Sequence, residues 1–355
     1  MMTESILKNE ERAVFALRSL YRRYGYAPYK MSRFEEYDLY VRNKDFLVSD
    51  QIITFSGDRG KLMALKPDVT LSIVKNAPEE PGVVQKVYYN ENVYRDYREI
   101  LQAGLECVGD LSDYEIAEVA LLAVKSLEAL GEPYVLDISH VGLISAVLEA
   151  CAVENRKKAM ECLRRKNLHE LEMLCGSNKA AWEKLSSLLR CHGGGEQLEV
   201  IGKILTTDTE KQALEQLKKL WNILEAAGYA QKVRLDFSVG TNMRYYSGVV
   251  FKGYLAGIPE SVLSGGQYDK LPQKMGRKAK AIGFAIYLNL LQGLYSREEE
   301  MCVDTLILHD GTVDTTVLAA AAEEAAKNGT ILVSRNLPQR HQYKSLIRFE
   351  KGVRV

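Results

Sequence analysis

The sequence has little of what marks several classes of protein. Its six cysteines form no Cys-x-x-Cys pair, and no histidine cluster stands at metal-ligand spacing, so we expect free thiols and no metal site. No stretch approaches the ~18 consecutive apolar residues of a transmembrane helix. The first twenty residues lack the apolar core of a signal peptide. These absences predict a cytoplasmic protein with no membrane segment.

The sequence also has no excess of charge of either sign. Lys and Arg together number 47, as do Asp and Glu, which gives a net formal charge of zero. Proteins that bind nucleic acids usually carry a basic excess to meet the phosphates. The balance therefore argues against a nucleic-acid partner. With 355 residues, 46% of them hydrophobic, the chain has enough material for about two domains with a substantial core.

Apolar periodicity predicts an α/β chain. A helical period covers residues 9–24 and ends at Gly25. The capping-box pair Ser112 and Glu115 opens a second helix, which Gly131 closes. Strand character appears at residues 52–55, 62–65, 83–109, 134–138, 233–237, 248–254, 262–263 and 281–285, the last of these running into a helix through Leu294.

Two further regions complete the expected organisation. Residues 142–230 are almost entirely helical in pattern, and we expect them to be an insertion in a core domain of residues 1–297. The triple glycine 193–195 lacks a preceding strand and a following Lys-Ser/Thr pair, so it favours a flexible helix connection over a phosphate loop. Residues 298–355 predict a small α/β unit, with strands at 305–308 and 331–334 and a helix at 317–327.

The most informative stretch is residues 88–109, YYNENVYRDYREILQAGLECVG. It predicts two strands joined by a very tight turn, because only Asp96 and Tyr97 separate Arg95 from the next arginine. Gln102 and Glu106 are four residues apart, so on one extended strand they share a face. We therefore expect Arg95, Gln102 and Glu106 to face one pocket.

Three other segments accompany this hairpin: LKPDVT (65–70), RYYSGVVF (244–251), and SGGQYDKL (264–271) followed by AIGFAIYLNLL (281–291). The hairpin lies between the first and second of these segments, and a helical insertion separates it from RYYSGVVF. In this order the four segments resemble the catalytic core of histidyl-tRNA synthetases. The resemblance implies a class II aminoacyl-tRNA synthetase fold. Such a fold has a mixed, mostly antiparallel sheet flanked by helices, here with the helical insertion and the small C-terminal unit.

The resemblance implies a relict amino-acid pocket that holds free histidine. Asp68, Thr70 and Gln102 would accept hydrogen bonds from its ammonium group. Glu106 and Tyr246 would meet its imidazole, whose two ring nitrogens need an acceptor and a group that donates or accepts. Arg95 would pair with its carboxylate, and Tyr268 would line the pocket. The complete expected set is Asp68, Thr70, Arg95, Gln102, Glu106, Tyr245, Tyr246 and Tyr268.

Other positions depart from the synthetase pattern. Thr241 stands where the resemblance places an arginine that acts during adenylate formation, and Leu290 stands where motif 3 has an arginine that contacts ATP. The two-residue turn of the hairpin leaves almost no loop to reach ATP or tRNA. Electrostatic stabilisation of a transferring phosphate is usually the largest catalytic contribution. We therefore expect no histidyl-adenylate chemistry, no catalytic residues and no cofactor.

A histidine pocket without this chemistry resembles the regulatory subunits of ATP phosphoribosyltransferase more closely than the synthetases. The segments FEEYDLYVRNKDFLVSDQIITF (34–55) and GKLMALKPDVTLSIVKN (60–76) strengthen that resemblance. It implies allosteric feedback regulation of the first step of histidine biosynthesis by L-histidine. It also implies a short-form catalytic subunit as partner, with a homodimer of this chain inside the hetero-oligomer, and makes residues 298–355 a truncated relic of an anticodon-binding domain.

Three alternatives stay open at this point. A minimal histidyl-tRNA synthetase or histidine-activating ligase would exchange pyrophosphate into ATP when histidine is present. A scaffold with a dead pocket would bind the partner without responding to histidine. In a third arrangement, the effector lies at the subunit interface and the old pocket only shapes it.

Overall fold

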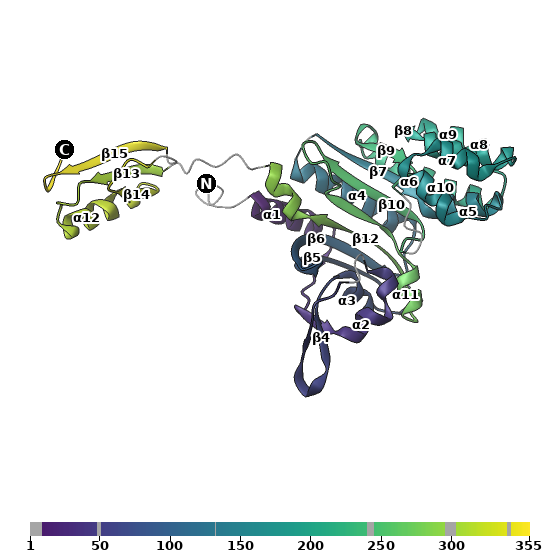
Figure 1. The fold of residues 1–355 in the computed structure, drawn as a ribbon, viewed down its shortest axis with the longest axis horizontal. Coiled ribbons are helices and arrows are strands. Elements are labelled where there is room, and N and C mark those ends of the chain that lie inside the picture. Colours follow the sequence, from purple (N-terminus) through teal and green to yellow (C-terminus); the bar gives the residue numbers. More distant parts are fainter. Residues whose placement is uncertain (1–8, 48–50, 132, 240–244, 295–302, 339–341) are drawn as a thin grey trace. The chain divides into compact units, whose positions relative to one another are not determined.

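The structure is a computed structural model of the 355-residue chain. It describes residues 9–47, 51–131, 133–239, 245–294, 303–338 and 342–355 (Figure 1). The chain forms two compact units, Met1–Leu294 and Tyr295–Val355. The sequence predicted this boundary between residues 297 and 298. Among the described residues, no helix is both long and apolar enough to cross a bilayer.

The first unit is built on a large sheet, in which nine strands pair among the described residues. Six of its pairings are antiparallel, and those of β1 with β5 and β7 with β9 are parallel. This arrangement confirms the predicted mixed, mostly antiparallel fold. In sheet order the strands are β1 (Ala27–Pro28), β5 (Val84–Arg95), β6 (Arg98–Gly109), β12 (Lys280–Tyr287), β11 (Leu263–Gln267), β10 (Val249–Leu255), β7 (Tyr134–His140), β9 (Val233–Asp236) and β8 (His192–Gly193).

Helices α1 (Asn9–Arg23) and α4 (Asp113–Leu130) cover one face of this sheet. The predicted capping box begins α4, since the Ser112 backbone N–H donates to Glu115 Oε2 at 2.8 Å. Leu127 packs so closely on β10 that a Cβ on Gly253 would lie 2.7 Å from its methyl carbon. The apolar side chains of α1, α4 and the strands form the main core on this face.

The helical insertion lies between β7 and β9 and gathers beside that end of the sheet (Figure 1). Its helices are α5 (Val141–Ala150), α6 (Arg156–Arg165), α7 (Leu168–Cys175), α8 (Lys179–Arg190), α9 (Glu196–Gly202) and α10 (Asp208–Ala226), followed by the short 3-10 helix η3 (Ala230–Lys232). The triple glycine connects α8 to α9, as expected, but its first residue belongs to a strand that the sequence did not predict. His192 and Gly193 form the edge strand β8, opposite Asp236 and Leu235 of β9.

The opposite face of the large sheet carries smaller elements. They are the helices α2 (Tyr37–Arg42), α3 (Thr70–Lys75) and α11 (Lys270–Lys274), the 3-10 helices η1 (Lys44–Phe46) and η2 (Asp58–Gly60), and a second sheet of β2 (Phe34–Glu36), β4 (Leu62–Leu65) and β3 (Thr54–Ser56). Strand β3 begins two residues later than expected. The predicted helix through Leu294 is instead the 3-10 helix η4 (Leu288–Leu294), whose Asn289 and Gly293 are poor α-helix formers.

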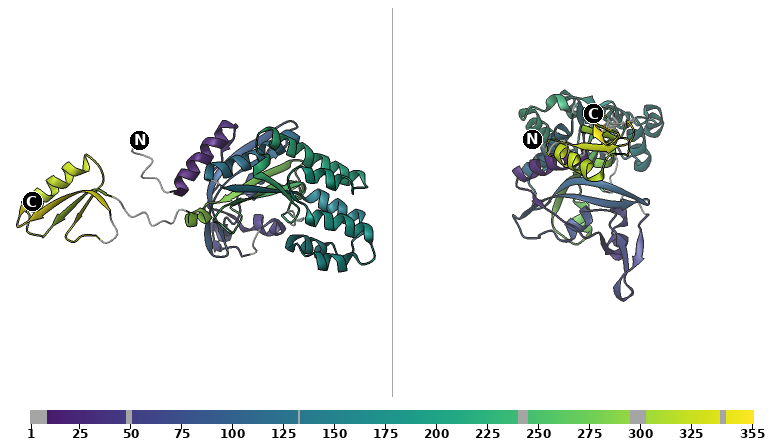
Figure 2. Two further views of the ribbon diagram at one scale, coloured as in Figure 1. Left: turned by 90° about the horizontal axis from the view of Figure 1, so that it is seen from above. Right: turned by 90° about the vertical axis from the view of Figure 1, so that its left-hand side faces the viewer.

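The second unit contains a four-stranded sheet in its described part. The strand order is β14 (Ile331–Ser334), β13 (Val303–His309), β15 (Tyr343–Glu350) and β16 (Val353–Arg354), and helix α12 (Thr315–Ala326) lies on one side of it (Figure 2). The strand β15 has no counterpart in the sequence expectations. Its first four residues are all exposed, so the segment lacks the clear alternation that marks a half-buried strand.

Candidate functional site

A cavity of about 370 Å³ lies on the face of the large sheet away from α4. Strand alternation turns Gln102 and Glu106 to this face, and the register aligns them with Tyr287 and Gly283 of β12. All eight residues expected from the sequence line this one cavity: Asp68, Thr70, Arg95, Gln102, Glu106, Tyr245, Tyr246 and Tyr268. Segments far apart in the chain therefore meet at the predicted place.

The hairpin of β5 and β6 supplies three of these side chains. Its ladder is continuous from the pair Val84 and Gly109 to the pair Arg95 and Arg98. Asp96 and Tyr97 close the turn with φ of 50° and 59°, which is the backbone of a type I′ turn. The expected two-residue turn is thus confirmed. Tyr97 is 81% exposed, so the turn points into solvent and places no loop over the cavity.

Glu106 is the central acceptor of the cavity and is only 2% exposed. Its Oε1 accepts a hydrogen bond from the Thr70 hydroxyl at 2.7 Å, and its Oε2 accepts one from the Tyr268 hydroxyl at 2.5 Å. Gly283 makes room for this carboxyl, because a Cβ on that residue would lie 1.7 Å from Oε2. Two strands, one helix and the residue that follows β11 therefore fix the position of a single carboxyl group.

Burial raises the pKa of Glu106 from 4.5 to about 8. The hydrogen bonds from Tyr268 and Thr70 lower it in part, and the nearby Asp68 charge raises it further. With a pKa near 8, the Glu106 carboxyl group is largely protonated at pH 7. A cationic group that enters the cavity would lower this pKa, so Glu106 can change its charge when a ligand binds.

The raised pKa of Glu106 predicts how the stability of the folded chain depends on pH. The unfolded chain loses the Glu106 proton near pH 4.5 and the folded chain near pH 8, so the folded state holds one more proton between these values. The free energy of unfolding should therefore fall as the pH rises across this window, by up to roughly 5 kcal/mol from this group. Urea unfolding of the wild type and of Glu106→Gln at pH 5.5, 6.5, 7.5 and 8.5 measures the effect. The variant should gain relative stability as pH rises, and parallel profiles would contradict the assignment.

Asp68 and Arg95 form a second buried group. Arg95 Nη2 lies 3.5 Å from Asp68 Oδ2, and Arg95 Nε donates to the Pro67 carbonyl at 2.6 Å. Burial raises the pKa of Asp68, while the Arg95 charge and the backbone N–H groups of Leu71 and Thr70 lower it. Arg95 was expected to pair with a ligand carboxylate. In the structure its guanidinium contacts Asp68 and the backbone.

The segment that carries Asp68 and Thr70 is held against the hairpin. The Tyr94 backbone N–H donates to the Lys66 carbonyl at 2.9 Å, and the buried Lys66 ammonium pairs with Glu91. Asp68 Oδ1 accepts from the Leu71 N–H at 2.9 Å, which holds the first turn of α3. The Pro-Asp pair thus serves as a helix start and also lines the cavity.

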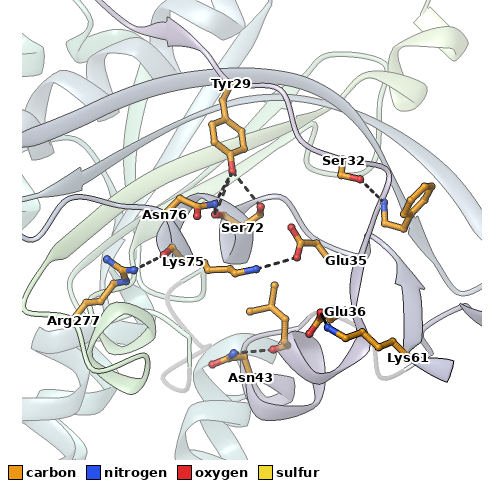
Figure 3. Close-up of polar contacts among 12 residues, drawn as sticks. Tyr29, Ser32, Glu35, Glu36, Asn43, Lys61, Ser72, Lys75, Asn76 and Arg277 are labelled. Carbon is orange, nitrogen blue, oxygen red and sulfur yellow. Dashed lines mark hydrogen bonds and ion pairs between the residues drawn. The ribbon is translucent and has the colours of Figure 1, made fainter. Parts of the chain in front are cut away.

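Polar contacts also fix the far end of α3 (Figure 3). The Tyr29 hydroxyl lies 3.1 Å from the Ser72 hydroxyl and donates to the Ser72 carbonyl at 3.3 Å. Arg277 donates to the carbonyls of Ala77, at 2.5 Å, and Lys75. Lys75 in turn pairs with Glu35 at 3.1 Å. These contacts hold the helix whose first residue donates to Glu106.

Aromatic rings form another wall. The Tyr245 ring lies 4.8 Å from that of Tyr246 and 5.6 Å from that of Tyr268, and Phe46 of η1 lies 5.9 Å from Tyr245. Burial raises the pKa of each of these three tyrosines, so their hydroxyls stay protonated and can donate. Thr241, which the sequence comparison with the synthetases singled out, lies outside the described residues, as does Arg244.

Gln102 carries a hydrogen-bonding group that lacks a partner. It is 2% exposed, and its Nε2 has no hydrogen bond within the part of the chain that the structure describes. A buried amide without a partner is costly, so a ligand that completes this bond gains free energy. Rotating the amide by half a turn places its oxygen, an acceptor, at the same point.

Several lining residues were missed by the sequence reasoning. The most notable is Lys252 of β10; Tyr89, Ser264, Gly283 and Tyr287 also contribute. Lys252 directly follows the segment RYYSGVVF, and strand alternation there would have placed it on the cavity face. In the described ranges, no cluster of three or more His, Cys, Asp or Glu side chains is placed to hold a metal.

With this geometry in place, comparison with known proteins identifies the family. The family model for histidyl-tRNA synthetase matches residues 2–291. The chain belongs to the histidyl-tRNA synthetase family. It is also similar, as the sequence indicated, to proteins named ATP phosphoribosyltransferase regulatory subunit. The one from Clostridium kluyveri is 29% identical over 288 residues, which cover 76% of this chain and 74% of that protein.

Solved structures of the family share the fold. The ATP phosphoribosyltransferase regulatory subunit/histidyl-tRNA synthetase of Bacillus halodurans matches with a TM-score of 0.77 and 24% identity, covering 96% of this chain and 93% of that one. A chain of the ATP phosphoribosyl transferase (HisG:HisZ) complex from Thermotoga maritima matches with a TM-score of 0.62 and 21% identity, covering 79% and 97%. At these identities the likeness establishes the class II fold.

Proposed function

We propose that this chain is a regulatory subunit of ATP phosphoribosyltransferase. It binds L-histidine in the cavity, and this binding inhibits the catalytic subunit with which the chain assembles. The observation that carries the proposal is the environment of Glu106. This buried carboxyl holds a proton near neutral pH and lies in one cavity with the Gln102 amide, whose nitrogen has no partner among the described residues. The names of the relatives from Clostridium kluyveri and Thermotoga maritima support the same assignment.

Free histidine matches the polar groups of the cavity. Its imidazole requires an acceptor and a second group that donates or accepts, which Glu106 and Tyr246 supply. Its ammonium requires acceptors, which Asp68, Thr70 and the Gln102 oxygen supply. Because the imidazole and the ammonium are both basic, binding of either beside Glu106 favours the ionised carboxylate. The surrounding tyrosine rings exclude water and so strengthen these contacts.

We further propose that the chain does not itself form an adenylate. The hairpin turn ends at Asp96 and Tyr97 without a loop that reaches over a nucleotide. Leu290, where motif 3 of the synthetases has an arginine, is partly buried against the main core. A leucine side chain offers no charge to a phosphate, so this position contributes no electrostatic stabilisation.

Feedback inhibition follows if histidine binds two arrangements of the complex unequally. The arrangement with low activity must hold histidine more tightly, and the difference sets the coupling, typically ~1–3 kcal/mol. By analogy with other class II cores, we propose that the regulatory chain acts as a homodimer within the hetero-oligomer.

Titration calorimetry with purified protein, alone and with its catalytic partner, tests the proposal. We expect histidine to bind at one site per chain, and the histidine affinity to change by about 5- to 150-fold when the partner is present. We expect no histidine-dependent exchange of pyrophosphate into ATP. Exchange at a synthetase-like rate would support the ligase alternative. Binding of the partner with no heat from histidine would support the scaffold alternative.

A further inference from the structure

Lys252 is a half-buried lysine at the centre of β10, and it lines the same cavity. It pairs across the sheet with Ser264 of β11 on one side and with Asp137 of β7 on the other. Its side chain is on the sheet face that also carries Gln102 and Glu106, because the register through β11 and β12 keeps these positions in phase.

Asp137, the acidic residue opposite Lys252 on β7, forms its ion pair with another residue. Asp137 is engaged by Arg234 of β9, whose Nε and Nη2 lie 2.8 and 3.1 Å from the two carboxylate oxygens. Both carboxylate oxygens of Asp137 therefore accept a hydrogen bond from Arg234. Within the described residues, Lys252 forms no ion pair with Asp137 or with another acid. Its ammonium is therefore available to a ligand.

The other described cation of the cavity wall is already engaged. Arg95 contacts Asp68 and the Pro67 carbonyl, and it is only 8% exposed. A ligand anion that took Arg95 would have to break the buried pair and leave Asp68 uncompensated, which is costly. An anion that meets Lys252 breaks no existing ion pair.

From these contacts we infer that Lys252 binds the carboxylate of the amino acid and makes the cavity selective for ligands that carry one. This inference rests on the proposed function, and it names the specificity residue of that site. β6 and β10 are three strand spacings apart in the sheet, roughly 14 Å, a gap that a molecule of amino-acid size spans together with the two side chains. The ring end of the ligand lies at Glu106 and the carboxylate end at Lys252.

The test compares histidine with histidinol, which keeps the imidazole and the ammonium but has an alcohol in place of the carboxylate. Titration calorimetry should show that wild-type protein binds histidine more tightly than histidinol. Lys252→Met keeps the aliphatic stem and removes the charge. It should weaken histidine binding by about 10- to 100-fold and change histidinol binding less than about twofold. Lys252→Arg, which keeps the charge, should retain most of the preference for histidine.

Lys278→Met is the matched control, because Lys278 is exposed and lies outside the cavity. It alters the net charge equally and should change neither affinity. Equal losses for both ligands in Lys252→Met, no loss for either, or equal affinities in the wild type would overturn the inference and leave the histidine pocket intact. If wild-type protein binds neither ligand, the proposed function fails and the inference with it.

Discussion

Replacing Glu106 by alanine is expected to weaken histidine binding by roughly 2–5 kcal/mol, which corresponds to about 30-fold or more. The loss follows from the position of this carboxyl, since Thr70 and Tyr268 orient it and burial excludes water from it. Two effects on the folded state oppose each other at pH 8, because the substitution removes a buried ionisable group but leaves the Thr70 and Tyr268 hydroxyls without their acceptor. Calorimetry measures the affinity, and urea unfolding at the same pH checks the fold.

Glu99→Ala provides the matched control. Glu99 lies on the same strand, β6, but is exposed and contacts Asn92 and Tyr94 on the hairpin surface. This control should bind histidine with wild-type affinity. If Glu106→Ala also binds histidine unchanged, the effector does not use the cavity, and the alternative with the effector at the subunit interface takes its place.

Replacing Gly283 by alanine should strongly destabilise the folded state. The new Cβ would lie 1.7 Å from Glu106 Oε2 and 2.5 Å from the Leu105 carbonyl oxygen, so both a side chain and a backbone must move. Overpacking of this kind costs roughly 3 kcal/mol. Displacing Glu106 should also abolish measurable histidine binding. Urea unfolding and calorimetry measure the two effects on one preparation.

Two further variants separate the causes of this effect. Gly202→Ala, at the end of α9, meets only a Leu214 methyl at 3.3 Å and should change stability by less than ~1 kcal/mol. The double variant Glu106→Ala, Gly283→Ala removes one of the two clashes. It should therefore be more stable than the sum of the single variants predicts. Strict additivity would show that the carboxyl does not occupy the space above Gly283.

The sequence predicted the parts of the site that strand alternation and motif order determine. Gln102 and Glu106 share a face because they are four residues apart on one strand, and the tight turn follows from the two residues between Arg95 and Arg98. The resemblance then brought Asp68 and Tyr268 to the same pocket, although almost two hundred residues separate them in the chain.

Which side chains of the site contact one another could not be predicted in this way. Whether Arg95 contacts a ligand or Asp68 depends on distances of a few ångströms between two segments, which motif spacing does not report. The pKa of Glu106 depends on burial beneath elements from three parts of the chain. Strand β8 was missed for a similar reason, because two residues carry too short a pattern for periodicity and pair only through the distant Asp236 and Leu235.

The unbroken ladder of β5 and β6 keeps the cavity residues of the hairpin away from its turn. Glu106 and Gln102 are fixed by pairs deep in the sheet, whereas the turn at Asp96 and Tyr97 lies beyond the last pair. Because the free energy of closing a loop rises only slowly with its length, residues can be added or deleted there without shifting the register below. A lineage can therefore lengthen or shorten the turn at the tip while Gln102 and Glu106 keep their positions at the base.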